Sequence, residues 1–152
     1  MSFETQLESL GYKLPPSPKA LASYIPAIRS GNFIWTSGQL PMIDGNLGLT
    51  GKLGYEVSIE EGMKQAKTAL LNALACIKAE IGDLDQIQRV LKLGVYVASI
   101  PDFTEHHLVA NGASDALQAI FGDKGRHVRF AIGVASLPLD ACVELELMVE
   151  LK

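Results

Sequence analysis

Residues 127–151 read HVRFAIGVASLPLDACVELELMVEL, and this stretch decides the fold class. Apolar side chains alternate with small or charged ones on both sides of a six-residue connection, residues 136–141. Such alternation is typical of half-buried β-strands, because successive side chains of a strand point to opposite faces. The pattern therefore predicts two strands, 127–135 and 142–151, which close the chain as an antiparallel hairpin.

Helical patterns precede these strands. Ser58 opens the clearest helix, because Glu61 follows three residues later in a capping box. Apolar residues then keep helical spacing as far as Gly82, a typical stop residue. A Val- and Leu-rich run predicts a strand over 89–99, and Pro101 and Asp102 are expected to lead into a second helix that runs to about Phe121.

The amino-terminal third predicts a second hairpin. Residues 1–10 are expected to form a short helix, which a proline-rich connection follows. Extended patterns over 20–28 and 32–37 flank a turn at residues 30–31, and the glycine-rich residues 41–57 predict a long loop. The order hairpin, helix, strand, helix and closing hairpin predicts an α+β fold, with two helices packed on one face of a mixed sheet.

One predicted strand is apolar on both faces. Phe33, Ile34 and Trp35 are consecutive, so at least one large apolar side chain points to each side of the sheet. A sheet whose one face lies under its own helices still has to bury the other. We therefore expect a partner subunit against that second face.

Length and composition exclude several classes of function. The 152 residues fit a single domain, and a net charge of −4 leaves no basic surface for nucleic acid. The N-terminus lacks the apolar core of a signal peptide, and no apolar run is long enough to span a membrane. Cys76 and Cys142 have no metal-site or redox spacing, which favours reduced thiols. We expect a cytoplasmic protein with no nucleic-acid and no membrane partner.

The closing hairpin carries a candidate site. Arg129 shares its face with small side chains only, which leaves space in front of the guanidinium. Symmetrical closure of the hairpin pairs Gly133 with Glu144 and Arg129 with Met148. In that register Arg129 and Glu144 point to the same face, with their Cα atoms roughly 13 Å apart, and could bracket a small ligand. A solvated edge arginine beside a solvated acidic stripe is the alternative interpretation.

Two motifs resemble the signatures of a known family. WTSGQLP occupies residues 35–41, and Arg129 stands eight residues before the Leu-Pro pair 137–138, which VELE at 143–146 follows. Together they resemble the YjgF/RidA family of reactive intermediate deaminases, also called endoribonuclease L-PSP. The resemblance covers about residues 20–151. It implies a chorismate-mutase-like fold and a homotrimer with ligand clefts between its subunits.

The resemblance also implies roles for individual residues. Arg129 matches the arginine that grips the substrate carboxylate, and Glu144 matches the acid that positions the attacking water. Tyr24 matches a tyrosine that lines the cleft. Ser37 and Gly38 match the cleft residues of the Ser-Gly-Gln turn. The expected site therefore combines a carboxylate anchor with a water-activating acid.

The chain departs from the family pattern in three places. Phe130 stands directly after the arginine, where typical members have a small polar residue. The second helix is longer, so the family's asparagine is matched either by Asn111 or, counting back from Phe121, by Ser114. Residues 1–19 form an N-terminal extension of the single domain. These features indicate a divergent branch, with Phe130, Asn111 and Ser114 as further candidate substrate-binding residues.

The implied reaction is hydrolysis of small enamines or imines derived from amino acids, of the 2-iminobutanoate or 2-iminopropanoate type, with no metal and no cofactor. A non-catalytic trimer that binds a small carboxylate in the same cleft is the alternative. The net charge disfavours an endoribonuclease. His106, His107 and His127, with Asp102 and Glu105 nearby, show no spacing that favours a metal site.

Overall fold

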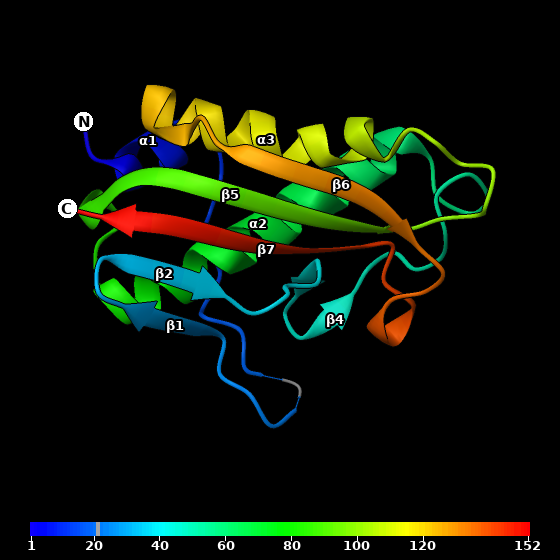
Figure 1. The fold of residues 1–152 in the computed structure, drawn as a ribbon, viewed down its shortest axis with the longest axis horizontal. Helices are drawn as coiled ribbons and strands as arrows, with labels where there is room; N and C mark the ends of the chain where they lie inside the picture. Colours follow the sequence, from blue (N-terminus) through cyan, green and yellow to red (C-terminus); the bar gives the residue numbers. More distant parts are fainter. Residues whose placement is uncertain (21) are drawn as a thin grey trace.

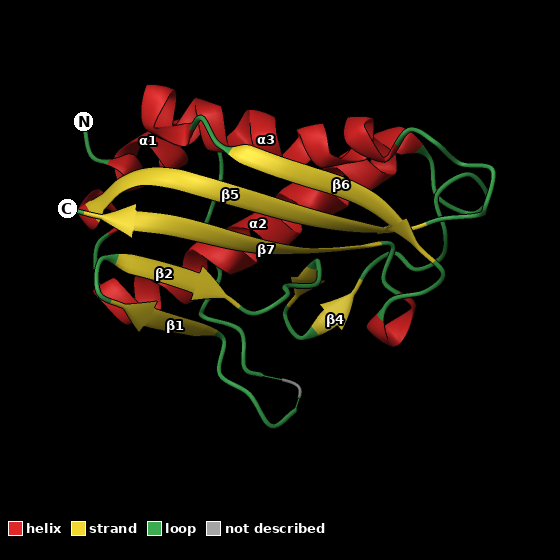
Figure 2. Cartoon of the chain, viewed as in Figure 1, coloured by secondary structure: helices red, strands yellow, loops and turns green. Residues whose placement is uncertain are grey.

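The computed structural model describes residues 1–20 and 22–152, which form a sheet with helices on one face (Figures 1 and 2). The five strands of this sheet are β1 (Ala27–Ser30), β2 (Phe33–Thr36), β5 (Ile87–Ala98), β6 (Val128–Val134) and β7 (Val143–Leu151). Their order across the sheet is β1-β2-β7-β5-β6. Neighbouring strands are antiparallel except β5 and β6, which are parallel. The α+β class is confirmed.

Two long helices, α2 (Ile59–Ile81) and α3 (His106–Phe121), lie behind the sheet in Figure 1. The predicted capping box begins α2: the Ser58 hydroxyl accepts from the Glu61 N–H, and the Glu61 carboxylate accepts from the Ser58 N–H. Gly82 ends the helix with a positive φ, as expected. The second helix begins later than predicted, at His106, because residues 101–105 form a turn and a loop.

The predicted N-terminal helix is present as α1 (Phe3–Ser9). The Glu4 carboxylate forms an ion pair with Lys78 near the end of α2, at 2.9 Å. The Asp85 carboxylate accepts from the Phe3 N–H at 2.7 Å, and the Phe3 ring packs edge-on against Phe121 of α3. These contacts join the N-terminal helix to the ends of both long helices.

The first hairpin and the glycine-rich segment differ in detail from expectation. The strand predicted over 20–28 begins only at Ala27, and Leu21 lies outside the described residues. Gly31 and Asn32, rather than residues 30–31, form the turn, since Ser30 pairs with Phe33. Residues 41–57 are not a plain loop, because β3 (Met42–Ile43) and β4 (Asn46–Leu47) form a small second sheet. The short 3₁₀ helices are η1 (Leu84–Gln86), η2 (Gly122–Gly125) and η3 (Pro138–Asp140).

The predicted closing hairpin is wrong, because β5 lies between β6 and β7. Leu93 of β5 pairs with Arg129 of β6 and with Leu147 of β7. Arg129 is therefore level with Leu147 and not, as predicted, with Met148, a difference of one residue. A slip of one residue moves a side chain to the opposite face of a sheet. Arg129 consequently lies on the helix-covered face, whereas Glu144 lies on the open face.

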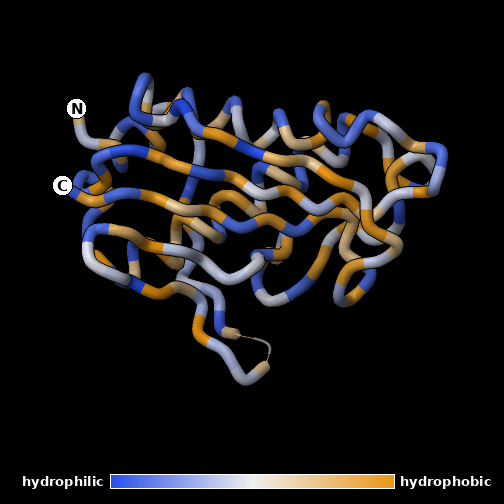
Figure 3. The backbone as a smooth tube through the Cα atoms, viewed as in Figure 1, coloured by the Kyte–Doolittle hydropathy of each residue, from blue (hydrophilic) through white to orange (hydrophobic). Residues whose placement is uncertain are grey.

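The core fills the space between the sheet and the two helices. The apolar stripe predicted for α2 is buried there, except for the half-buried Met63. Figure 3 shows hydrophobic stretches along the central strands. The open face of the sheet is also partly apolar, since Phe33 and Trp35 are 40% and 42% exposed. Further exposed apolar side chains on that face are Ile28, Val128 and Ile132.

Both cysteines are buried free thiols. Burial raises the pKa of Cys142 to about 11, so this thiol stays protonated at neutral pH. Across residues 1–20 and 22–152, no helix has the length and apolar character needed to cross a membrane.

Candidate functional site

Arg129 lies on the edge strand β6, and its guanidinium is held by α3. Nη1 donates to the Asn111 side-chain oxygen at 2.8 Å and to the Ser114 hydroxyl at 3.0 Å. Nη2 donates to the main-chain oxygen of His107 at 3.0 Å. Asn111 and Ser114, the two alternatives for the family asparagine, therefore both contact the arginine, one turn of helix apart.

These contacts leave part of the guanidinium for a ligand. A guanidinium has five N–H donors, and the three contacts to α3 use two on Nη1 and one on Nη2. Nε–H and the second N–H of Nη2 have no acceptor within hydrogen-bond distance among the described residues, so they can donate as a pair to one carboxylate. The array thus forms an oriented anion site.

The small residues on the face of Arg129 serve a purpose other than the expected one. A side chain at Gly133 would collide with His106 of α3 and with the Ser99 hydroxyl, which are hydrogen-bonded to each other at 3.1 Å. The space beside Gly133 is therefore occupied by the helix rather than open in front of the arginine. Small residues on β6 let α3 come close enough to hold Arg129.

His127 contributes to this array and was not predicted to do so. Its Nε2 lies 2.9 Å from the Ser114 hydroxyl, and its Nδ1 lies 2.6 Å from the main-chain oxygen of Gly125. The available sequence signal was its position two residues before Arg129, which places both side chains on one face of an extended chain. Its role depends on packing against α3, which the sequence pattern does not show.

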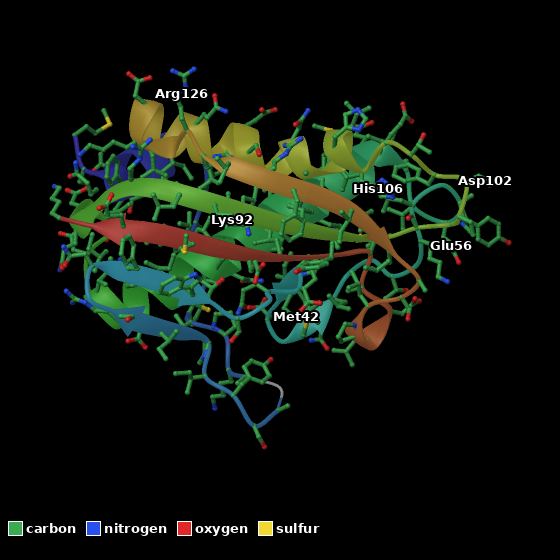
Figure 4. The ribbon with its side chains drawn as sticks, in the orientation of Figure 1. Met42, Glu56, Lys92, Asp102, His106 and Arg126 are labelled. Carbon is green, nitrogen blue, oxygen red and sulfur yellow. The ribbon has the colours of Figure 1, made fainter. Side chains whose placement is uncertain are left out.

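Glu144 belongs to a second group of predicted residues, around a cavity of about 570 Å³ that Asn72 of α2 also lines. Tyr24 and Gly38 also line this cavity. A side chain at Gly38 would displace the Glu144 carboxylate, which lies where a Cβ would be. Met42, labelled in Figure 4, lines the same cavity, as does the N-terminal segment with Pro15, Pro16 and Pro18.

Two polar residues support the loops around this cavity. The Ser37 hydroxyl donates to the main-chain oxygen of Ile25 at 2.5 Å, which ties the Ser-Gly-Gln turn to the segment that carries Tyr24. Asn72, on α2, is buried and donates from its amide to the main-chain oxygens of Leu40 and Met42, both at 2.9 Å. Asn72 was not predicted, although an asparagine inside an apolar helical stripe was a usable signal.

The environment of Glu144 favours its protonated form. Burial raises the pKa of the Glu144 carboxyl, and the neighbouring Glu146 carboxylate raises that pKa further. Burial, together with Glu146 and Glu144, also raises the pKa of Tyr96, which pairs with Glu144 across the sheet. A carboxyl whose pKa moves toward neutrality is suited to accept and return a proton during a reaction.

Phe130 lies apart from Arg129. Its ring is on the open face, 5.3 Å from the Tyr96 ring centroid, and Lys92 lies over it at 5.3 Å. Figure 4 shows Lys92 on the face of the sheet turned away from the helices. A side chain at Gly94 would collide with the Phe130 ring, which explains the glycine between Phe130 and Glu146.

Arg129 and Glu144 are not brought together within one chain. Three residues along the sheet and two strand spacings separate their positions, which amounts to roughly 14 Å between Cα atoms. Their side chains also lie on opposite faces, and Arg129 does not line the cavity beside Glu144. The chain thus carries two half-sites: the Arg129 half-site with Asn111 and Ser114, and the Glu144 half-site with Tyr24 and Gly38.

Two of the three histidines form side-chain hydrogen bonds to serines rather than belonging to a metal-binding cluster. His106 contacts Ser99 and His127 contacts Ser114. Within the described part of the chain, no group of three or more His, Cys, Asp or Glu residues could hold a metal ion.

Comparison with known proteins decides the family. The family model described as “YjgF/chorismate mutase-like, putative endoribonuclease” matches residues 4–151. The chain belongs to this family. The YjgF-type fold inferred from the sequence motifs is thereby confirmed, and it extends over the N-terminal helix as well as over the two half-sites.

Several known proteins are similar to this chain over most of their length. Protein TCP17 of Trypanosoma cruzi is 44% identical over 146 residues, which are 95% of this chain and 91% of that protein. The crystal structure of protein Atu1372 of Agrobacterium tumefaciens is 44% identical, with a TM-score of 0.92, and the match covers 99% of this chain and 92% of that one. The Escherichia coli protein named “putative reactive intermediate deaminase TdcF” is 27% identical over 133 residues, 86% of this chain and 88% of TdcF.

The raised pKa of Glu144 predicts a pH-dependent stability in this YjgF-family chain. Glu144 binds its proton more tightly in the folded state than in the unfolded state. Glu144 therefore contributes favourably to stability at pH values below its pKa in the unfolded chain, and this contribution is lost as the pH rises through its pKa in the folded protein. Glu144→Gln should therefore increase the free energy of unfolding at pH 7 to 8 and change it little near pH 4. Urea unfolding across this pH range measures the effect.

Glu150→Gln, on the same strand and the same face, is the matched control. It should leave the pH dependence of unfolding as it is in the unsubstituted protein. Equal pH profiles for Glu144→Gln and the unsubstituted protein would contradict the assignment of the raised pKa to Glu144.

Proposed function

We propose that this chain hydrolyses small imines and enamines derived from amino acids, in clefts that form between the subunits of a homotrimer. The observation that carries the proposal is the Arg129 guanidinium, which α3 holds by three hydrogen bonds while two donors remain for a carboxylate. The similarity to TdcF, a relative named for reactive intermediate deamination, supports the same reaction class.

Recognition begins with the substrate carboxylate. The planar guanidinium can donate two parallel hydrogen bonds to both carboxylate oxygens, which fixes the position and the orientation of a small 2-imino acid. With the carboxylate held, the imine carbon one bond away has a defined place relative to the second half-site. Positioning of this kind supplies a large share of the rate for a reaction as easy as imine hydrolysis.

Glu144 would supply the proton transfers. Its carboxylate accepts a proton from water as the water oxygen bonds to the carbon of the protonated imine, whose nitrogen becomes a neutral amine. The carboxyl then returns the proton to this nitrogen, the carbon–nitrogen bond breaks as the hydroxyl of the intermediate gives its proton back to the Glu144 carboxylate, and ammonia leaves. The products of imine and water are a 2-oxo acid and ammonia. The raised pKa of Glu144 suits both directions of transfer.

A site shared between subunits would allow the two half-sites, which lie on opposite faces of the sheet, to act on one substrate. The two half-sites lie on opposite faces of one chain, so one substrate can meet both only if the Glu144 half-site comes from a neighbouring copy. The open face of the sheet, with Phe33 and Trp35 about two-fifths exposed, gives such a neighbour an apolar surface to cover. A cyclic trimer contains three equivalent contacts and so three complete clefts.

Mixing two inactive variants tests the shared site. Arg129→Ala and Glu144→Gln should each lose turnover of 2-iminobutanoate generated in the assay. After refolding together in equal amounts, about a quarter of all clefts should combine an intact Arg129 with an intact Glu144, since half of the subunits supply each side. We expect recovery of about a quarter of the unsubstituted rate, measured as 2-oxobutanoate release.

The control is the same pair mixed without refolding, which should stay inactive as long as subunits do not exchange. No recovery after joint refolding would contradict a site between subunits, while leaving imine hydrolysis possible within one chain. An unsubstituted protein that does not accelerate 2-iminobutanoate hydrolysis would overturn the reaction itself.

One observation favours a second candidate, a carboxylate-binding protein without catalysis. The Arg129 half-site is complete within one chain and does not involve Glu144. This alternative predicts that 2-oxobutanoate binds with equal affinity to the unsubstituted protein and to Glu144→Gln, and that neither protein turns over an imine. Loss of turnover in Glu144→Gln with retained binding would favour the deaminase.

A further inference from the structure

A one-directional chain of hydrogen bonds runs from Arg129 through Ser114 to His127. We propose that His127 is a positioning residue which, through the Ser114 hydroxyl, holds the Arg129 guanidinium in its carboxylate-binding orientation. The proposal rests on the proposed function for the identity of the ligand as a carboxylate. It assigns a role to a residue that neither binds substrate nor touches the reacting atoms.

The donor-to-acceptor direction of this series of hydrogen bonds follows from its last member, the main-chain oxygen of Gly125. The main-chain oxygen of Gly125 can only accept, so the 2.6 Å contact requires a proton on Nδ1 of His127. In the neutral imidazole Nε2 then carries a lone pair, and the Ser114 hydroxyl, 2.9 Å away, donates to it. The lone pairs of the Ser114 oxygen are left to accept from Nη1 of Arg129.

Close backbone packing around Gly125 fixes the position of this last hydrogen-bond acceptor. A side chain at Gly125 would collide with the main-chain oxygen of Leu117, so η2 packs directly against α3. This packing sets the position of the Gly125 oxygen relative to Ser114, which lies on the same helix as Leu117 and is 6% exposed. His127 therefore bridges two points whose separation the backbone determines.

Without His127, the Ser114 hydroxyl has another acceptor. A serine inside a helix commonly donates to the main-chain oxygen four residues earlier, here that of Ala110. That rotation would move the Ser114 oxygen away from Nη1, and Asn111 alone would then hold Nη1. The guanidinium plane could turn, and the paired donors on its free edge would lose their alignment for a carboxylate.

Binding of 2-oxobutanoate, measured by titration calorimetry, tests the proposal. His127→Phe keeps a ring of similar size but removes the acceptor, and we expect its affinity to fall by about fivefold, the usual effect of losing one hydrogen bond. His127→Gln restores an acceptor oxygen for the Ser114 hydroxyl, and its affinity should lie within about twofold of the unsubstituted protein. The loss in His127→Phe should appear in KM for 2-iminobutanoate with little change in kcat, whereas His127→Gln should change neither KM nor kcat by more than about twofold.

A double-mutant cycle separates positioning from packing. If His127 acts only through Ser114, His127→Phe should have no further effect on affinity in a Ser114→Ala background. If His127 and Ser114 acted independently, the factors by which the two substitutions lower the affinity for 2-oxobutanoate would multiply. Multiplied losses, an unchanged affinity in His127→Phe, or an equal loss in His127→Gln would each overturn the proposal.

The same titration distinguishes this proposal from the proposed function. Arg129→Ala should abolish 2-oxobutanoate binding if the arginine is the carboxylate anchor. Retained binding in Arg129→Ala would contradict the anchor and hence the proposed function. Loss in Arg129→Ala together with unaltered binding in His127→Phe would contradict the role of His127 alone.

Discussion

Replacing Arg129 with alanine should lower kcat/KM for 2-iminobutanoate by about 100-fold. A charge-assisted pair of hydrogen bonds to a carboxylate contributes about 2 to 3 kcal/mol, which corresponds to a loss of this size. Arg129→Lys should recover only a small part, because an ammonium group cannot donate two parallel hydrogen bonds and also reach the three acceptors on α3. Initial rates of 2-oxobutanoate release give the comparison.

Arg126→Ala is the matched control for the loss of one positive charge. Arg126 is exposed, as Figure 4 shows, and stands three residues before Arg129. Its removal should change kcat/KM by less than about twofold, because an exposed charge is screened by solvent and salt. Equal losses for the two alanine variants would point to general electrostatic attraction of the substrate rather than to a specific anchor.

Gly112→Ala should destabilise the fold by about 3 kcal/mol, although alanine is the better helix former. Gly112 lies on α3 where this helix crosses α2, and the main-chain oxygen of Met63 occupies the place of its Cβ. Backbone cannot move aside as a flexible side chain can, so the two helices would have to separate. Urea unfolding monitored by circular dichroism measures the change in the free energy of unfolding.

Gly48→Ala provides the control, since nothing lies within 4 Å of a Cβ at that position. Its effect should stay within about 0.5 kcal/mol, as for most exposed substitutions. If Gly112→Ala proved as harmless as Gly48→Ala, the close crossing of α2 and α3 would be contradicted. The crossing also positions the proposed anion site, because α3 carries the Asn111 and Ser114 side chains that hold Arg129.

At Glu144, the same burial is expected to lower stability and to favour the proposed catalysis. The burial that raises its pKa costs stability at neutral pH, where the charged form predominates in the unfolded chain. The same burial adapts the carboxyl to proton transfer. The substitution that we expect to stabilise the protein, Glu144→Gln, is thus also the one that should remove turnover, a common relation at active sites.

Local signals in the sequence determined the individual elements. The capping box at Ser58 sets the beginning of α2, and Gly82 sets its end. Both signals act through hydrogen bonds and backbone conformations within a few residues, so they can be recognised in the sequence. Alternation identified β6 and β7, and the two motifs identified the family. The two short strands within the glycine-rich segment were not predicted, since β3 and β4 have two residues each and too little pattern to detect.

Only the tertiary structure decided how these elements combine into a site. The insertion of β5 between β6 and β7 depends on contacts far apart in the sequence, and the pattern of either strand is equally compatible with a hairpin. Because side chains alternate along a strand, the resulting shift of one residue moved Arg129 and Glu144 to opposite faces. The sequence by itself named Arg129, Asn111, Ser114 and Glu144 as candidates. Packing of α3 against β6 determined what holds Arg129 and brought the unpredicted His127 to Ser114.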